Sequence, residues 1–248
     1  MSMRSIILGS VTLAAATGST FAGITGSLNV QASVDGTLAT WNVPINVPDL
    51  GPTETWTWTM QNPYTFSNGA KMPSFRIEVV GDPVVNLFFG VQAAGVATNF
   101  TITSALNGFP VIASAEGRAT AGITVTDDGA LGNGATLTGN YAGNKAYRAF
   151  YNGAVPGAGA TFATLVDGLV VPGAIVTDTT SEAFPVLAGT FSPIAGPVST
   201  MSSQFSFLLT ADDLASGTSS YVIRDQIPTP GAVSLLGLAG LVVARRRR

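Results

Sequence analysis

The stretch Ile24-Thr-Gly-Ser-Leu-Asn-Val-Gln-Ala-Ser-Val34, followed by Asp35-Gly36, alternates apolar and polar side chains. The apolar residues take even positions, and threonine, serine, asparagine and glutamine take the odd positions between them. Because successive side chains of a strand point to opposite faces, this pattern predicts a strand with one buried face. Asp-Gly is typical of a tight hairpin turn. We therefore expect a half-buried strand over residues 24–34, which turns back into a second strand over residues 38–43.

The same two-residue period recurs along the chain and is interrupted by Gly, Pro, Asn and Asp. It predicts further strands over residues 55–59, 74–80, 84–91, 99–106, 118–126, 135–141, 146–151, 162–170, 182–191, 201–210 and 219–224. None of these segments has a sustained helical period. Many short strands separated by turn residues indicate an all-β fold, which we expect to be a single antiparallel β-sandwich of about ten strands, with a jelly roll as the close variant. One domain over residues 23–226 is the simplest division, because no change of composition interrupts it.

The N-terminal residues 1–22 have the three parts of a secretory signal peptide. Arg4 supplies a positive charge, residues 6–16 are small and apolar, and Thr20-Phe-Ala22 is a suitable cleavage site. An N-terminal strand of the fold is the alternative. We expect a signal helix here and an exported protein.

The C-terminal residues 227–248 combine a proline-containing turn, an uncharged apolar run and a basic end. The apolar run over residues 232–244 would form a helix of roughly 20 Å, which is short for a ~30 Å hydrocarbon core. A buried core helix is therefore the alternative. The run ends in four arginines that favour a membrane face, where they would act as a cationic stop: Arg245, Arg246, Arg247 and Arg248. We expect a short transmembrane helix here.

This order of turn, apolar helix and arginine cluster resembles the PEP-CTERM sorting signal of Gram-negative bacteria. Pro228 and Pro230 match the two prolines of that motif, and Thr229 stands where the motif usually has glutamate. The resemblance implies a transient association with the inner membrane and recognition by an exosortase, an inner-membrane processing enzyme. It also implies transfer to the outer surface or the extracellular polysaccharide matrix. It covers under a tenth of the chain. The same tail also ends proteins described as ice-binding.

Composition excludes several classes of function. The chain contains neither cysteine nor histidine, so it has no disulfide, no thiolate metal site and no imidazole base. Between residues 24 and 227 there are six basic and fourteen acidic residues, a net charge of −8. A domain with this acidic charge lacks the basic surface that binds nucleic acid. We also expect no cofactor and no enzyme activity. A secreted glycosidase that uses two carboxylates is the remaining catalytic alternative.

Asp127, Asp128 and Asn133 lie in a glycine-rich loop that could supply oxygen ligands to calcium. The loop lacks the alternating register of an EF-hand. A hairpin turn formed by Asp-Gly and Asn-Gly accounts for the same residues.

Trp41, Trp56 and Trp58 could form a platform on which sugar rings stack. Trp56 and Trp58 share one face of a predicted strand, and large aromatic side chains at alternate positions usually fill a core. Core packing is therefore the alternative reading.

Thr-x-Thr pairs recur in the chain, at residues 55–59, 101–103, 124–126, 136–138 and 177–179. A flat ice-binding face needs such pairs at one fixed repeat, and these intervals are irregular. The solvent side of ordinary strands explains them.

The first hypothesis is an exported surface or matrix protein with a structural or adhesive β-sandwich, which the secretion machinery and an exosortase deliver. The second is a surface-displayed carbohydrate-binding module, with extracellular polysaccharide as its partner.

Overall fold

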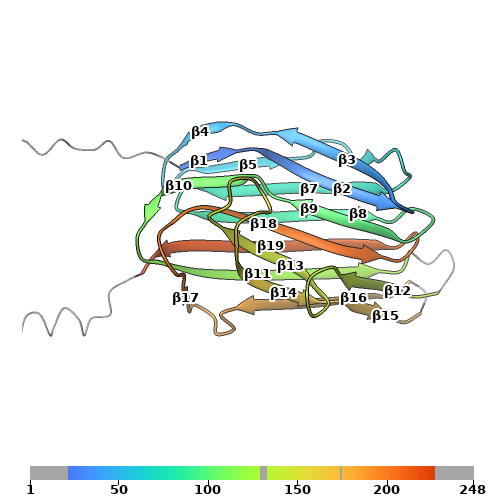
Figure 1. Ribbon diagram of the computed structural model, residues 1–248. Helices are drawn as coiled ribbons and strands as arrows, with labels where there is room; N and C mark the ends of the chain where they lie inside the picture. Colours follow the sequence, from blue (N-terminus) through green and yellow to red (C-terminus); the bar gives the residue numbers. More distant parts are fainter. Residues whose placement is uncertain (1–21, 129–132, 174, 227–248) are drawn as a thin grey trace, which may run out of the picture.

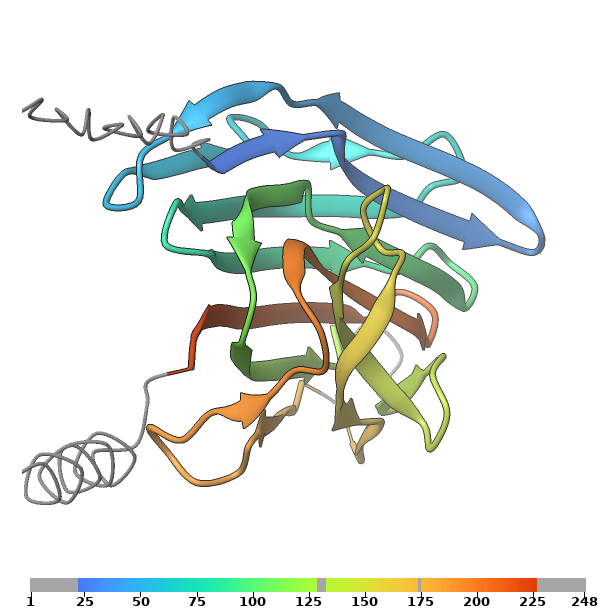
Figure 2. The ribbon, with the colours of Figure 1, turned by 60° about the vertical axis from the view of Figure 1, so that its left-hand side comes forward.

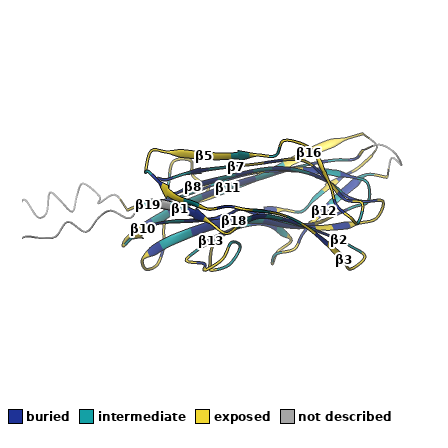
Figure 3. Cartoon of the chain, turned by 90° about the horizontal axis from the view of Figure 1, so that it is seen from above, coloured by how far each residue is buried: buried dark blue, intermediate teal, exposed yellow. Residues whose placement is uncertain are grey.

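The computed structural model describes residues 22–128, 133–173 and 175–226. Two antiparallel sheets lie face to face (Figures 1 and 3), and buried residues of both sheets form one hydrophobic core. The expected all-β sandwich is therefore confirmed. Within the described ranges no helix has the length and apolar character needed to cross a bilayer.

Sheet A contains eleven strands. Its main path runs β3-β2-β9-β18-β10-β1-β4. The bounds of these strands are β1 Ala22–Thr25, β2 Ser27–Val34, β3 Thr37–Pro44, β4 Val47–Leu50, β9 Thr98–Thr103, β10 Leu106–Ile112 and β18 Val198–Leu209. Four more strands extend the sheet from the other edge of β18: β12 Ala135–Gly139, β13 Lys145–Tyr151, β14 Ala160–Asp167 and β15 Leu169–Val171.

Sheet B contains eight strands, with the main path β16-β11-β19-β8-β7-β5. The bounds of these strands are β5 Thr55–Thr59, β7 Lys71–Val80, β8 Val84–Gln92, β11 Ala115–Thr126, β16 Thr177–Phe184 and β19 Leu214–Asp225. Two short strands, β6 Tyr64–Thr65 and β17 Ser192–Pro193, pair with β7 and β11. Edge strands β3 and β5 lie at the same end of the sandwich, as Figure 2 shows.

The hydrophobic core lies between the sheets. The rings of Phe205 and Phe207 on β18 contact Phe89 on β8, with centroid distances of 4.9 and 6.0 Å. The same Phe205 ring lies 4.9 Å from Tyr147 on β13. All four side chains are almost completely buried. Aromatic packing of this kind contributes more than burial alone, so β18 and its neighbours fix the two sheets to each other.

The described residues form nineteen strands, where the sequence pattern predicted about ten. Part of the difference comes from breaks at glycine. The expected strand over residues 24–34 is two strands, because Gly26 adopts a φ of 89° and the chain changes partners there. The chain also changes partners at Gly168, because β14 pairs with β13 whereas β15 pairs with β12. The other additions are short strands within segments that read as loops, such as β4, β6 and β17.

The expected signal helix over residues 1–22 and the expected membrane helix in residues 227–248 fall almost entirely outside the described residues. Only Ala22 of the signal segment is described, and it begins β1.

Candidate functional site

The outer face of sheet A carries a continuous row of polar side chains. The strand register aligns one polar residue from each of six neighbouring strands: Asn42, Asn29, Thr103, Gln204, Arg148 and Thr164. At the ordinary strand spacing such a row extends for roughly 24 Å. A second row, two residues along, contains Thr40, Gln31, Thr101 and Ser206. Apart from Arg148, these side chains are uncharged.

A groove of about 240 Å³ lies over this face. Its walls come from β2, β9 and β18, and Pro156 of the loop between β13 and β14 covers one side. The backbone N–H of Gly157 donates to Ser202 Oγ at 3.1 Å, which holds that loop against the sheet. The groove is therefore formed by rigid elements and not by loops alone.

Gln204 is the centre of an oriented hydrogen-bond chain. Tyr141 Oη donates to Gln204 Oε1 at 2.6 Å, and Gln204 Nε2 donates to Thr103 Oγ1 at 2.8 Å. Burial raises the pKa of Tyr141 well above its usual value, although Arg148 opposes this shift. The phenol consequently stays protonated and remains a donor, which fixes the orientation of the Gln204 amide.

A second set of hydrogen bonds lies beside the first. Asn140 Nδ2 donates to Asn99 Oδ1 at 2.8 Å and to Ser206 Oγ at 2.9 Å. The side-chain amides of Asn29 and Gln31, which line the groove, make no hydrogen bond within the described part of the chain. The groove thus combines fixed polar groups with two amides that are available to a ligand.

The outer face of sheet B has a larger but shallow hollow of about 640 Å³. Short side chains and backbone line much of it, including Ala121, Gly122 and Ala183. The one acid in its lining, Glu182, is bound to Lys145 at 2.6 Å. Despite its size, this hollow offers fewer long hydrogen-bonding side chains than the sheet A groove.

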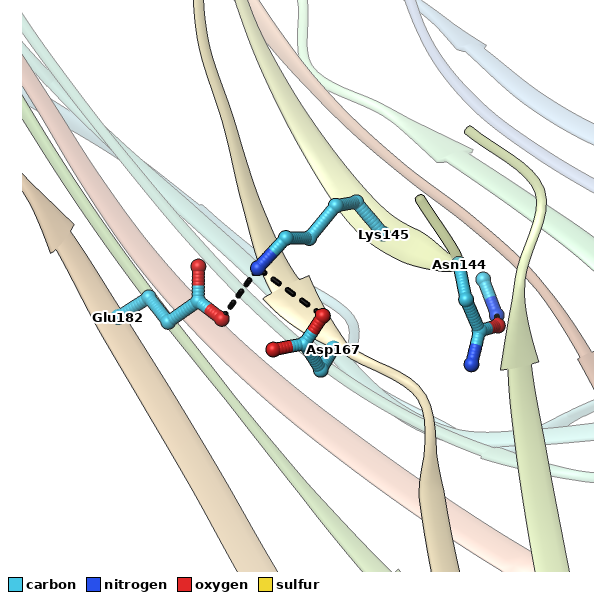
Figure 4. A network of polar contacts seen from close by, with 5 residues as sticks. Asn144, Lys145, Asp167 and Glu182 are labelled. Carbon is cyan, nitrogen blue, oxygen red and sulfur yellow. Dashed lines mark hydrogen bonds and ion pairs between the residues drawn. The ribbon is translucent and has the colours of Figure 1, made fainter. Parts of the chain in front are cut away.

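Lys145 links the two sheets (Figure 4). Its Nζ lies 2.6 Å from Glu182 Oε1 on β16 of sheet B and 3.0 Å from Asp167 Oδ1 on β14 of sheet A. Burial lowers the pKa of Lys145, but hydrogen bonds to Glu182 and Asp167 outweigh that effect and the net shift is upward. The hydrogen bond from Lys145 lowers the pKa of Asp167. This cluster is an inter-sheet clamp.

Asp127 and Asp128 follow β11 of sheet B, and Asn133 precedes β12 of sheet A. Because β11 and β12 belong to different sheets, the hairpin interpretation of these residues is wrong. Asp127 is buried and accepts a hydrogen bond from the Gly134 N–H at 2.6 Å, whereas Asp128 and Asn133 are exposed. Asp213 lies close by on the chain segment before β19. Burial raises its pKa and the charges of Asp127 and Asp128 add to the rise, whereas hydrogen bonds from Thr210 and the Asp128 backbone oppose it. Across the described ranges, no three carboxylates gather in a geometry that would hold a metal ion.

The three tryptophans lie at the end of the sandwich where the edge strands β3 and β5 are found. Trp41 on β3 contacts Trp58 on β5 and Phe75 on β7, with centroid distances of 5.5 and 5.4 Å. These rings are tilted by 51–55° and are not coplanar. All three tryptophans, including Trp56, are partly buried against the core. This placement favours packing between β3 and β5 over an exposed sugar platform.

Two of the Thr-x-Thr pairs meet on the outer face of sheet B. Thr124 and Thr126 on β11 stand opposite Thr179 and Thr177 on β16, with hydroxyl oxygens 2.9 Å apart in both pairs. The next strand places Ser216 beside Thr124, so the threonine array ends after two strands. The hydroxyls bond to each other, as expected for cross-strand pairs.

Comparison with known proteins assigns this chain to no family. No protein-family model matches this chain, and no curated protein is similar to it. Among solved structures, the infectious bursal disease virus Gx strain is similar over 86% of this chain and 60% of that chain, with 11% identity and a TM-score of 0.26. The infectious bursal disease virus VP2 subviral particle is similar over 92% and 74%, with 11% identity and a TM-score of 0.10. Scores this low carry no argument about fold or function.

The sorting residues Pro228, Thr229 and Pro230, and the arginines at 245–248, lie outside the described residues. The groove residues are the part that sequence reasoning missed. Their only signal was the polar half of the alternation, seen in Ser27, Asn29 and Gln31, which reads equally well as an ordinary solvent-facing side.

Proposed function

We propose that this chain is an exported, non-catalytic surface or matrix protein, sorted by an exosortase through residues 227–248, which holds extracellular polysaccharide on the outer face of sheet A. The tail motif supports the delivery route. The polar groove supports the binding function. The sandwich serves as a rigid support for that face.

The observation that carries the binding function is the cross-strand row through Asn29, Thr103 and Gln204. Neutral sugars are recognised by amides and hydroxyls that both donate and accept hydrogen bonds, and this row consists of such groups. The chain from Tyr141 through Gln204 to Thr103 orients them before a ligand arrives. Preorganisation lowers the entropic cost of binding.

The positions of the carboxylates support a non-catalytic role. Glu116 pairs with Arg224 at 2.7 Å, Glu78 with Arg76 at 2.8 Å, and Glu182 with Lys145 at 2.6 Å. A retaining or inverting glycosidase needs two carboxyl groups facing each other across the substrate. Among the residues that the structure describes, no acid lines the sheet A groove.

Binding is tested by substitution of the groove. We expect Asn29→Ala combined with Gln31→Ala to weaken retention of the full chain on exopolysaccharide in affinity electrophoresis, because these amides are available to a ligand. Thr218→Val in the sheet B hollow is the matched control and should bind normally. If the groove variant and the unaltered protein are retained equally, the outer face of sheet A is not the face that binds polysaccharide.

Delivery is tested separately. Deletion of Arg245–Arg248 should release the protein into the medium or misroute it, because the cationic stop is lost. Replacement of the four arginines by lysines retains the charge and should preserve fractionation. Unchanged fractionation of the deletion variant would count against the sorting route.

A further inference from the structure

Three arginines of the described chain lie over an aromatic ring, and they differ in one respect. Arg76 lies 5.4 Å from the Phe88 centroid and binds Glu78 at 2.8 Å. Arg224 lies 3.5 Å from the Phe191 centroid and binds Glu116 at 2.7 Å. Arg148 lies 4.2 Å from the Tyr141 centroid, and within the described residues it has neither an acid nor a hydrogen-bond partner.

The missing partner leaves a polar group unsatisfied. Arg148 Nε is buried and makes no hydrogen bond. A buried donor without a partner costs stability, and a guanidinium fork fits the two oxygens of a carboxylate. The first two arginines show that this fold satisfies a stacked guanidinium with a carboxylate. At Arg148 none of the described residues supplies one.

Arg148 adjoins the groove. It stands opposite Gln204 in the β13–β18 register, and Tyr141 contacts both residues through its ring and its hydroxyl. The aligned row around it holds amides and hydroxyls and no acid, although the body as a whole is acidic. The attraction for an anion is therefore local.

We propose that Arg148 binds the carboxylate of an acidic sugar, so that the polysaccharide on sheet A is one that contains uronic acid residues. Neighbouring Gln204, Thr103 and Asn29 contact its hydroxyl groups. This inference rests on the proposed binding function of the same face.

The test compares polygalacturonate with the same polymer after its carboxyl groups have been reduced to neutral galactose. The full chain should bind polygalacturonate about 10- to 100-fold more tightly, as expected for a charge-assisted bidentate pair. Arg148→Gln should abolish that preference, so that the variant binds polygalacturonate and the reduced polymer with equal affinity. Arg76→Gln, which removes a stacked arginine with its own acid partner, is the matched control and should keep the preference.

Arg148→Lys provides a second variant in case the glutamine variant is destabilised. It keeps the charge but loses the planar fork, so its preference should be intermediate. Full preference in a folded Arg148→Gln protein would overturn the inference. Equal binding of both polymers by the unaltered protein would overturn it while leaving the binding function intact. If the unaltered protein binds neither polymer, and the Asn29→Ala/Gln31→Ala variant is retained normally on exopolysaccharide, both this inference and the proposed binding function are wrong.

Discussion

Replacement of Lys145 by methionine removes the clamp between the sheets while keeping the length and apolar part of the side chain. Lys145 and Glu182 have side chains that are 24% and 27% exposed, whereas Asp167 is 61% exposed. Exposed pairs contribute about 0.2–1 kcal/mol, and removal of one partner of a buried pair costs about 3–5 kcal/mol. The half-buried clamp lies between these limits and nearer the lower one. We expect the free energy of unfolding to fall by about 1–2 kcal/mol.

The assay is denaturant and thermal unfolding of the full chain followed by circular dichroism. For a domain of this size the loss corresponds to a fall in Tm of about 2–8 °C. Lys71→Met is the matched control, because Lys71 is an exposed lysine at the start of β7 without an ion pair in the described part of the chain. A cycle with Glu182→Gln should show coupling, since one interaction is removed in both single variants. Equal destabilisation by the two lysine substitutions, or additive effects of Lys145→Met and Glu182→Gln, would refute the clamp.

The pH dependence of the clamp follows from Asp167. Its folded pKa lies below its unfolded value of about 3.9, so the folded state favours the charged form. This contribution is present above that unfolded value and is lost as the pH falls through the folded pKa. The stability difference between the unaltered protein and Lys145→Met should therefore narrow below about pH 4.

Two further predictions concern stability. Asp213→Asn should raise Tm at pH 7, because burial raises the folded pKa of Asp213 and its ionised form opposes folding. The gain in Tm should shrink as the pH falls toward the unfolded pKa of this carboxyl group. A lower Tm of the variant at neutral pH would contradict this prediction. Gly217→Ala should lower the free energy of unfolding by about 1–3 kcal/mol, since its Cβ would lie 2.4 Å from Phe89 Cε1, whereas Gly95→Ala, with open space around it, should leave stability nearly unchanged in the same denaturant titration.

The sequence pattern predicted the fold class because the two-residue period is a local property. Residues 55–59 form the expected strand without change, and β8 and β18 differ from their expected bounds by only a few residues. The prediction was less accurate at β16, which was expected over residues 182–191 and lies over Thr177–Phe184. Its threonines and Asp178 gave no apolar alternation, because this edge strand buries little of its surface.

The candidate site could not be predicted in the same way, because it depends on register between distant segments. Thr103 and Gln204 are 101 residues apart and share a hydrogen bond only because β9 and β18 pair. Nothing in the local sequence around Arg148 indicates that its guanidinium lies over the Tyr141 ring, or that no described acid pairs with it. The tryptophans illustrate the opposite case, since their alternation already suggested packing, and the structure places them against the core.

Delivery of this sandwich to the cell surface through a processed tail is tested most directly by mass spectrometry of the protein recovered from outside the cell. We predict a mature chain that ends near Pro230 and lacks the apolar run and the arginines. Recovery of secreted protein with Arg248 still at its C-terminus would contradict it.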